Sequence, residues 1–382
     1  MRVRYLLDMD TLTFCGWTAF QLHRIPPVAW MLHSLLMQEE TAPHAPRHEP
    51  DALDLLERVG VTPPFHAVFH DHLNRKRRTR LTPHVRPRST MKTHEIPLAA
   101  DGRFDSPLAT LLMLGTSLSP AQLALAGSEM LGGFTVYRPP QAMQALLNEL
   151  STGIPAEAYT ELAHEVRFGA WQQCRTPDGK PTSLWHRPPL LHRDEIARTI
   201  TTHPKAYGRR TLVQAERLMV ANARSPFEVQ AAMLLCSPRR LGGEGLGIPS
   251  CNHRVDLSES SRAIAHQDTC YSDILLVGKN GHEIGLECHS ITWHDGHSKA
   301  MRDARRTMAL TCEGIEVIHL THEQISDDEQ ASVIAETLRK KLGVRLSAPS
   351  VELLRKRAQL RSEVLVDWET LGQPQINLPH RS

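Results

Sequence analysis

The chain has 382 residues, of which 41% are hydrophobic and 23% charged, a composition typical of a globular protein long enough for two or three domains. Its formal net charge is only +2, so the molecule is not a polycation of the kind that coats nucleic acid, and any phosphate-binding surface must be local. No apolar run reaches the ~18 residues of a membrane span, Asp8 and Asp10 interrupt the apolar core that a signal peptide needs, and the 7 cysteines form no close pairs, so a cytoplasmic protein without membrane contact is expected.

The first two hundred residues predict short helices and strands between proline-rich loops. Asp51 to Val59 suits a short helix, and the alternating apolar residues of 65–69 favour a strand. The dipeptides Ser106-Pro107 and Ser119-Pro120 each mark the start of a helix. Two helical stretches are expected between residues 151 and 205.

The strongest run of positive charge consists of Arg75, Lys76, Arg77 and Arg78. Arginine and lysine neutralise the nucleic-acid backbone without reading sequence, so this run is a candidate nucleic-acid contact. The alternative is a solvated hairpin tip, because the run contains no aromatic residue that could stack on a base. Both interpretations stay open.

A helix is expected from Arg209 towards Asn222, and a second helix from Ser225. Ser225 followed three residues later by Glu228 is a capping box, so Glu228 either bonds only its own helix terminus or also faces a functional site. The glycine-rich stretch 242–247 lacks the Gly-Lys-Ser or Gly-Lys-Thr of a nucleotide-binding loop, and it is expected to turn tightly into a sheet.

Two apolar runs, Tyr271 to Val277 and Ile284 to Ile291, flank the turn sequence 278–281 and predict a β-hairpin. Because side chains alternate along a strand, Glu287 and His289 share one face of the second run.

Cys288 falls on the face opposite to Glu287 and His289. A register that sets Asp273 opposite Glu287 brings the two carboxylates to one face, whereas a slip by one residue separates them.

A helix is expected to begin at Ser298 and to end at Gly314, and its apolar side chains at helical spacing are Met301, Ala304, Met308 and Cys312. Glu316 to Leu320 then predicts a strand, and the order strand, helix, strand implies a parallel pair joined by a right-handed crossover. Helices over Ser326 to Leu342 and Val351 to Leu360 follow, and the chain after them reads as a polar, mobile tail.

Asp273 and Glu287 on neighbouring strands are the arrangement that a divalent-metal phosphodiesterase needs. Carboxylate oxygens bind hard ions such as Mg²⁺ or Mn²⁺, and the ion polarises a phosphate and activates water. The carboxylates have an alternative role as structural ion-pair partners of Arg302, Arg305 or Arg306.

The stretch from residue 225 to residue 321 resembles the PD-(D/E)XK nuclease superfamily, and within it the very-short-patch-repair-like endonuclease domain of unknown function. The residues that carry the resemblance, in order, are Ser225-Pro226-Phe227-Glu228, Gly242 to Pro249, Asn252, Asp273, Glu287, Ser290, His294, Asp303, Arg305-Arg306, Gly314 and Thr321. The resemblance implies an α/β, restriction-endonuclease-like C-terminal domain with a metal held by Asp273 and Glu287, and it implies that Glu228 assists.

The position two after the strand glutamate departs from the superfamily. It is usually lysine, and in this subgroup often aspartate, but here it is His289. Histidine can act as a general base, but it lacks the permanent charge of lysine beside the phosphate. His294 and Lys299 are the candidates to substitute for it, and Arg305 and Arg306 are candidates to contact nucleic acid. A zinc site that combines Cys288 with nearby histidines is a weaker alternative, since Cys288 and His289 point to opposite faces.

Residues 103–114 and the helix after Ser119 resemble the middle portion of AbiEi-type antitoxin proteins. The expected organisation is therefore an AbiEi-like, mixed α+β region over residues 1–200, an endonuclease-like domain over 201–345 and a C-terminal tail over 346–382. Two functions follow from the resemblances. One is metal-dependent hydrolysis of nucleic acid, with DNA as the expected partner, and the other is a catalytically inactive nucleic-acid-binding or antitoxin-like protein with a cognate toxin as its partner. The oligomeric state is left open.

Overall fold

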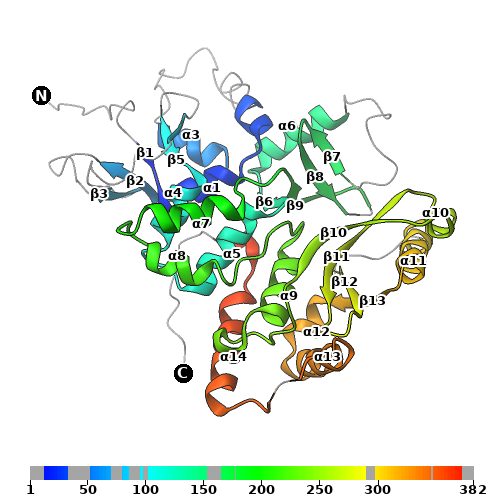
Figure 1. The fold of residues 1–382 in the computed structure, drawn as a ribbon. Coiled ribbons are helices and arrows are strands. Elements are labelled where there is room, and N and C mark those ends of the chain that lie inside the picture. The colour runs from blue at the N-terminus through cyan, green and yellow to red at the C-terminus, as the bar shows by residue number, and fades with distance from the viewer. Residues whose placement is uncertain are drawn as a thin grey trace, which may run out of the picture.

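The chain folds into an α/β structure on three β-sheets within the residues that the computed structural model describes (Figure 1). The described residues are 13–32, 52–69, 80–85, 95–97, 102–152, 165–176, 178–289, 297–345 and 347–371. No helix among them is long and apolar enough to cross a membrane.

The first sheet has the strand order β3-β2-β1-β5-β4. Its strands are β1 (Thr13–Phe14), β2 (Phe65–Phe69), β3 (Leu81–Val85), β4 (Glu95–Pro97) and β5 (Arg103–Asp105). The helices of this region are α1 (Gly16–Arg24), α3 (Ala52–Arg58) and α4 (Pro107–Leu114). The strand predicted over residues 65–69 and the helices predicted after Asp51 and Ser106 are confirmed, and the Ser106 hydroxyl caps α4 by accepting from the amide of Ala109.

The second sheet is antiparallel, with the order β6-β9-β8-β7. Its strands are β6 (Phe134–Val136), β7 (Glu165–Phe168), β8 (Trp171–Arg175) and β9 (Pro181–His186). The helices beside it in the chain are α5 (Pro120–Leu131), α6 (Gln141–Thr152), α7 (Arg193–Thr202) and α8 (Arg209–Ala215). The capping box predicted at Ser119 is present at the start of α5.

Of the two helical stretches expected over residues 151–205, one is α7, and residues 153–164 lie outside the described part of the chain. Strands β7 to β9 follow from residue 165, and Gly169 and Gly179 take positive φ angles of 65° and 82° in the turns between them. One expectation for this region was wrong. The helix from Arg209 ends at Ala215 instead of running to Asn222, and the chain after it turns to bury Leu218 and Met219 in the core.

The third sheet holds the candidate site, and its strand order is β10-β11-β12-β13. Its strands are β10 (Ser250–Asp256), β11 (Thr269–Val277), β12 (Glu283–His289) and β13 (Ile315–Thr321). β11 and β12 form the predicted hairpin, with Gly281 at a φ of 77° in the turn. β12 and β13 are parallel and α11 (His297–Cys312) lies between them in the chain, so the predicted order of strand, helix and parallel strand is confirmed. The other helices are α9 (Pro226–Cys236), η4 (Arg239–Leu241), α10 (Glu259–Ala265), α12 (His322–Ser326), α13 (Asp328–Lys341), α14 (Val351–Val364) and η5 (Trp368–Thr370).

The third sheet is covered by α9 on one face and by α11 on the other (Figure 1). We call these the α9 face and the α11 face. Ile274, Leu286 and Leu320 belong to the largest core cluster on the α9 face. Leu275 and Ile315 belong to a smaller cluster on the α11 face, together with Ala309 and Leu310 of α11. Side chains therefore alternate along the strands, as predicted from the sequence, and they pack into two different hydrophobic cores, one on each face of the sheet.

The orientation of α11 differs from expectation. The apolar side chains at helical spacing were expected to form its packed face, yet Met301 and Met308 are 58% and 55% exposed. The packed face carries Ala309 and Leu310, both with 0% exposure, and Arg306. These lie on the opposite side of the helix from the methionines, since 3.6 residues make one turn.

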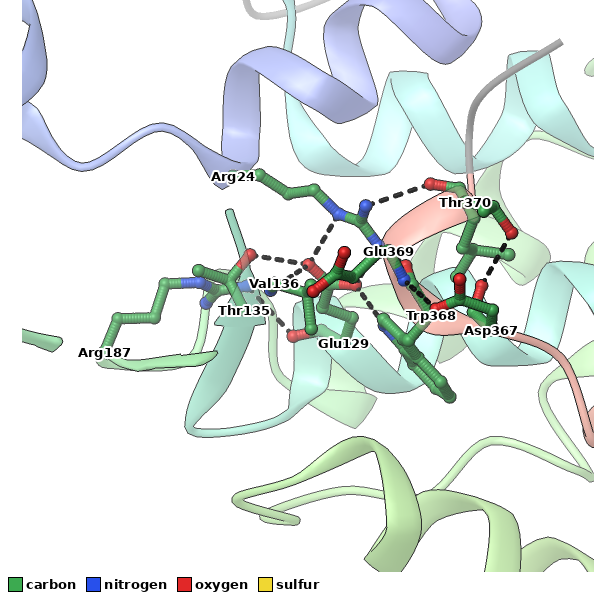
Figure 2. A network of polar contacts seen from close by, with 10 residues as sticks. Arg24, Glu129, Thr135, Val136, Arg187, Asp367, Trp368, Glu369 and Thr370 are labelled. Carbon is green, nitrogen blue, oxygen red and sulfur yellow. Dashed lines mark hydrogen bonds and ion pairs between the residues drawn. The ribbon is translucent and has the colours of Figure 1, made fainter. Parts of the chain in front are cut away.

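The largest core cluster contains side chains from both sides of residue 200, among them Leu125, Met219 and Leu286. The domain boundary near residue 200 stays a prediction. A network of polar contacts also joins distant parts of the chain (Figure 2). The buried carboxylate of Glu129 on α5 accepts from Arg24 at 2.9 and 2.6 Å and from the indole N–H of Trp368 at 2.6 Å.

The same network shows that the C-terminal segment is docked as far as residue 371. Trp368 is buried, its ring lies near Phe134, and Arg24 donates to the carbonyl of Leu371 at 2.9 Å. The expectation of a mobile tail after Leu360 is therefore wrong for residues 361–371, and residues 372–382 lie outside the described part of the chain. Val364 and Trp368 belong to the largest core cluster and Leu371 packs against it, so apolar contacts and buried polar partners together hold the segment.

Candidate functional site

Asp273 lies where strands β11 and β12 part. The paired ladder ends at Ile274 opposite Leu286, and continuation of this register places Asp273 beside Glu287. The Asp273 carboxylate takes up the space between the strands, where its Oδ2 accepts from the amide of Cys288 at 2.8 Å. Burial raises the pKa of the Asp273 carboxyl, although the nearby Arg306 and the bond from Cys288 oppose the shift.

Glu228 approaches Asp273 from the first turn of α9. Its Oε1 accepts from the hydroxyl of Ser225 at 2.8 Å and its Oε2 from the amide of Arg224 at 2.7 Å. Burial, and then the negative charge of Asp273, raise the pKa of Glu228 to about 8. Glu228 therefore bonds the backbone and side chain at the start of its own helix and also lies close to Asp273, while a functional role for it stays a prediction.

Glu287 is 1% exposed and forms an ion pair with Arg306 of α11. The Oε2 atom of Glu287 accepts from the Arg306 guanidinium, whereas its Oε1 atom is buried without a hydrogen-bond partner. A buried carboxylate oxygen without a partner is costly, since it has lost its hydration and gained nothing in return. This oxygen has the chemistry to accept a hydrogen bond or to bind a cation.

His289 ends strand β12 and contacts a second histidine that the sequence did not single out. Its Nε2 lies 2.7 Å from the Nδ1 of His319 on β13, and the ring centroids are 4.9 Å apart. The parallel register places His319 directly beside Glu287. His289 is also close enough to Asp273 to act on the pKa of its carboxyl, which places the histidine pair at the rim of the carboxylates.

One predicted site residue lies away from the carboxylates, and others fall outside the described part of the chain. Arg305 is exposed on the outer side of α11, away from the carboxylates, whereas Arg306 faces them. The basic run 75–78 and His294 lie outside the described residues, and so does the side chain of Lys299. Among the described residues the structure places Glu228 and His289 close to Asp273, and it places Arg306 against both Asp273 and Glu287.

One residue beside the site, His319, was not singled out by sequence reasoning. His319 could have been found only with the register of β13 against β12, which no local pattern fixes. Asn252 on β10 lies opposite Asp273, between the pairs Cys251–Ile274 and His253–Ser272, and it takes a positive φ of 48°. Such a backbone conformation outside glycine is uncommon and tolerated best by asparagine.

A divalent cation is compatible with the donor atoms of this site. Among the described residues, no group of three or more histidine, cysteine or acidic side chains is arranged to hold a metal ion. Mg²⁺, however, commonly uses one or two carboxylates and keeps several water ligands. Asp273 and Glu287 supply two carboxylates, and the unpartnered Oε1 of Glu287 is a free hard oxygen. These two residues would hold the ion.

Cys288 does not belong to this group of donors. It packs against the core on the α9 face, and burial raises the pKa of its thiol well above the ordinary value. Zinc binds the thiolate form, which this environment disfavours. The alternative of a zinc site that combines Cys288 with His289 is therefore not supported by the described residues.

Comparison with known proteins gives no relative for this chain. No protein-family model matches it, no curated protein matches its sequence, and no solved structure matches its fold.

Proposed function

We propose that residues 201–345 form a restriction-endonuclease-like domain that hydrolyses phosphodiester bonds in nucleic acid with the help of Mg²⁺ or Mn²⁺. The observation that carries the proposal is the position of Asp273 at the end of the β11–β12 ladder, where the register continues towards Glu287, while Glu228 and Arg306 are both close enough to interact electrostatically with Asp273. The antiparallel hairpin followed by a parallel strand, helix, strand unit supports the proposed fold.

Each side chain has a defined role in this proposal. Asp273 and Glu287 hold the ion, which when bound would polarise a phosphate and activate water. Glu228 accepts hydrogen bonds from Ser225 and from the amide of Arg224 at the start of α9, and burial together with the charge of Asp273 raises its pKa to about 8, so it holds a proton beside Asp273 at neutral pH. Arg306 can offer a planar set of N–H donors to a phosphate once Glu287 shares its charge with a cation. His289, at the rim, accepts or donates a proton near the phosphate.

A second candidate is a protein that retains this fold for recognition without turnover, such as a nucleic-acid-binding or AbiEi-type antitoxin-like protein with a cognate toxin. Three observations favour it. Arg306 already neutralises Glu287, both oxygens of Glu228 are occupied at its own helix end, and His289 stands where the resembled nucleases place lysine or aspartate.

Calorimetry with Mg²⁺ and Mn²⁺ and a nicking assay on supercoiled plasmid would separate the candidates. The samples are the wild type, the isosteric double variant Asp273→Asn/Glu287→Gln, and Asp256→Asn as a control for an exposed acidic residue on the neighbouring strand β10. The proposal expects ion binding and nicking in the wild type and the control, and loss of both in the double variant.

Wild-type protein that is folded by circular dichroism, yet neither binds an ion nor cuts plasmid or a structured RNA, would remove the enzyme proposal. Ion binding without cleavage would favour the second candidate. Cleavage that persists in the double variant would place the active site elsewhere.

A further inference from the structure

The pair formed by His289 and His319 is unusual because the two residues are not direct neighbours in the sheet. In the parallel register His289 lies opposite Thr321, and His319 lies opposite Glu287, so the two rings meet diagonally across the strands. They meet through specific atoms, the Nε2 of His289 and the Nδ1 of His319, at 2.7 Å. This distance is that of a good hydrogen bond, in which one ring must donate and the other accept.

Such a bond restricts His289 in two ways. A neutral imidazole carries one N–H and one lone pair, so the bond couples the two rings: the Nε2 of His289 carries the proton only when the Nδ1 of His319 does not. The bond also limits rotation of a ring that is otherwise only half-buried at the end of a strand. Contacts of this kind orient functional histidines in many metal and catalytic sites.

We propose that His319 is a positioning residue of this site, which holds the imidazole of His289 in one orientation and one tautomer beside Asp273 and Glu287. What His289 does to a substrate rests on the proposed function. How His289 is held rests on the hydrogen bond, and it can be tested without any activity.

The atoms of the bond supply a matched set of variants. His319→Asn places a side-chain amide close to the position of Nδ1, the atom that makes the bond. His319→Gln reaches the position of Nε2 instead, and His319→Leu has no polar atom. His282→Asn is the control, because His282 bonds Glu316 near the start of β12, away from the carboxylates.

The first measurement is the two-bond ¹H–¹⁵N correlation spectrum of histidine-labelled protein, in which the tautomer of each imidazole is visible. The His289 signal is assigned by its loss in His289→Gln. The proposal expects a single His289 tautomer in the wild type, in His319→Asn and in His282→Asn, and a mixture in His319→Gln and His319→Leu. An unchanged His289 tautomer in His319→Leu, or equal disturbance by Asn and Leu, would overturn the inference.

The second measurement is the rate of plasmid nicking at saturating Mn²⁺. We expect kcat to fall by about 10- to 100-fold in His319→Leu, the usual effect of removing a group that orients a ligand or catalytic residue, with KM nearly unchanged and recovery in His319→Asn. Equal kcat values in the wild type and His319→Leu would contradict the inference. If the wild type does not cut at all, the proposed function fails, while the spectra still decide whether His319 holds His289.

Discussion

The guanidinium of Arg306 reaches from α11 to the buried carboxylate of Glu287 on β12, and this contact sets the face that α11 turns towards its sheet. Ala309 and Leu310, three and four residues further along the helix, lie on the same side and are fully buried. The ion pair and the small apolar contact therefore act together. They outweigh the longer apolar stripe that contains Met301 and Met308, which is left in solvent.

Removal of Arg306 should leave the buried carboxylate of Glu287 without a counter-charge and so lower the stability of the fold. We expect Arg306→Leu to lower the free energy of unfolding by about 1 to 3 kcal/mol, less than for a fully buried pair because the Arg306 side chain is 33% exposed. In Arg306→Leu/Glu287→Gln the loss should be smaller, since no unpaired charge remains. Urea unfolding of the two single variants and the double variant gives the coupling energy directly. Strict additivity of the three values would mean that the two side chains do not interact in solution.

The orientation of α11 predicts opposite results for two apolar side chains two residues apart. Leu310 is fully buried, so Leu310→Ala should cost about 2 to 5 kcal/mol of stability through lost contacts and a cavity. Met308 is 55% exposed, so Met308→Ala should change stability by no more than about 0.5 kcal/mol. Thermal or urea unfolding distinguishes the two. A larger loss for Met308→Ala than for Leu310→Ala would require the helix to be rotated by about half a turn.

The hairpin and the crossover could be predicted from sequence because each depends on local information. The glycines of residues 278–281 fix the turn, and the turn fixes the register that sets Asp273 opposite Glu287. The helix of residues 297–312 was also found, but its packed face was not. The spacing of apolar residues predicts that the helix face with Met301 and Met308 is packed. The opposite face is packed instead, because Arg306 pairs with Glu287, which lies outside the helix.

The rest of the site depends on contacts that no local pattern contains. His319 joins His289 only through the parallel register of β12 and β13. The strands of residues 165–186 were not predicted from the sequence, because their turn glycines were not recognised and because the partner strand β6 lies far away in the sequence. Trp368 likewise finds its acceptor, Glu129, across more than two hundred residues.

The network around Glu129 should decide how firmly the C-terminal segment is held. Trp368→Phe removes one hydrogen bond to a carboxylate that keeps its bonds from Arg24, and it should cost about 1.5 to 3 kcal/mol. Glu129→Gln leaves the buried Arg24 without its counter-charge and should cost about 3 to 5 kcal/mol. Trp17→Phe is a control with a ring packed edge-on against Phe20.

Urea unfolding measures these free energies, and limited proteolysis reports whether the segment is released. We expect cleavage after residue 364 to be faster in Trp368→Phe than in the Trp17→Phe control, because a segment that opens locally is cut first. Identical stability and proteolysis in Trp368→Phe and the wild type would show that the segment is held by other contacts.

The pKa of Glu228 makes stability depend on pH in a defined direction. Because burial and Asp273 raise this pKa to about 8, the folded protein keeps a proton on Glu228 between pH 4.5, the ordinary value, and pH 8, whereas the unfolded chain releases it. Stability should therefore fall as pH rises through this window, with a slope of up to about 1.4 kcal/mol per pH unit for one proton.

The variant Glu228→Gln tests this dependence because its side chain does not titrate. Its stability relative to the wild type should improve steadily from pH 5 to pH 8 in metal-free buffer. Glu259→Gln, at an exposed glutamate of α10, should show no such trend. Parallel stability curves for the wild type and Glu228→Gln across this range would mean that Glu228 is ionised in the folded protein.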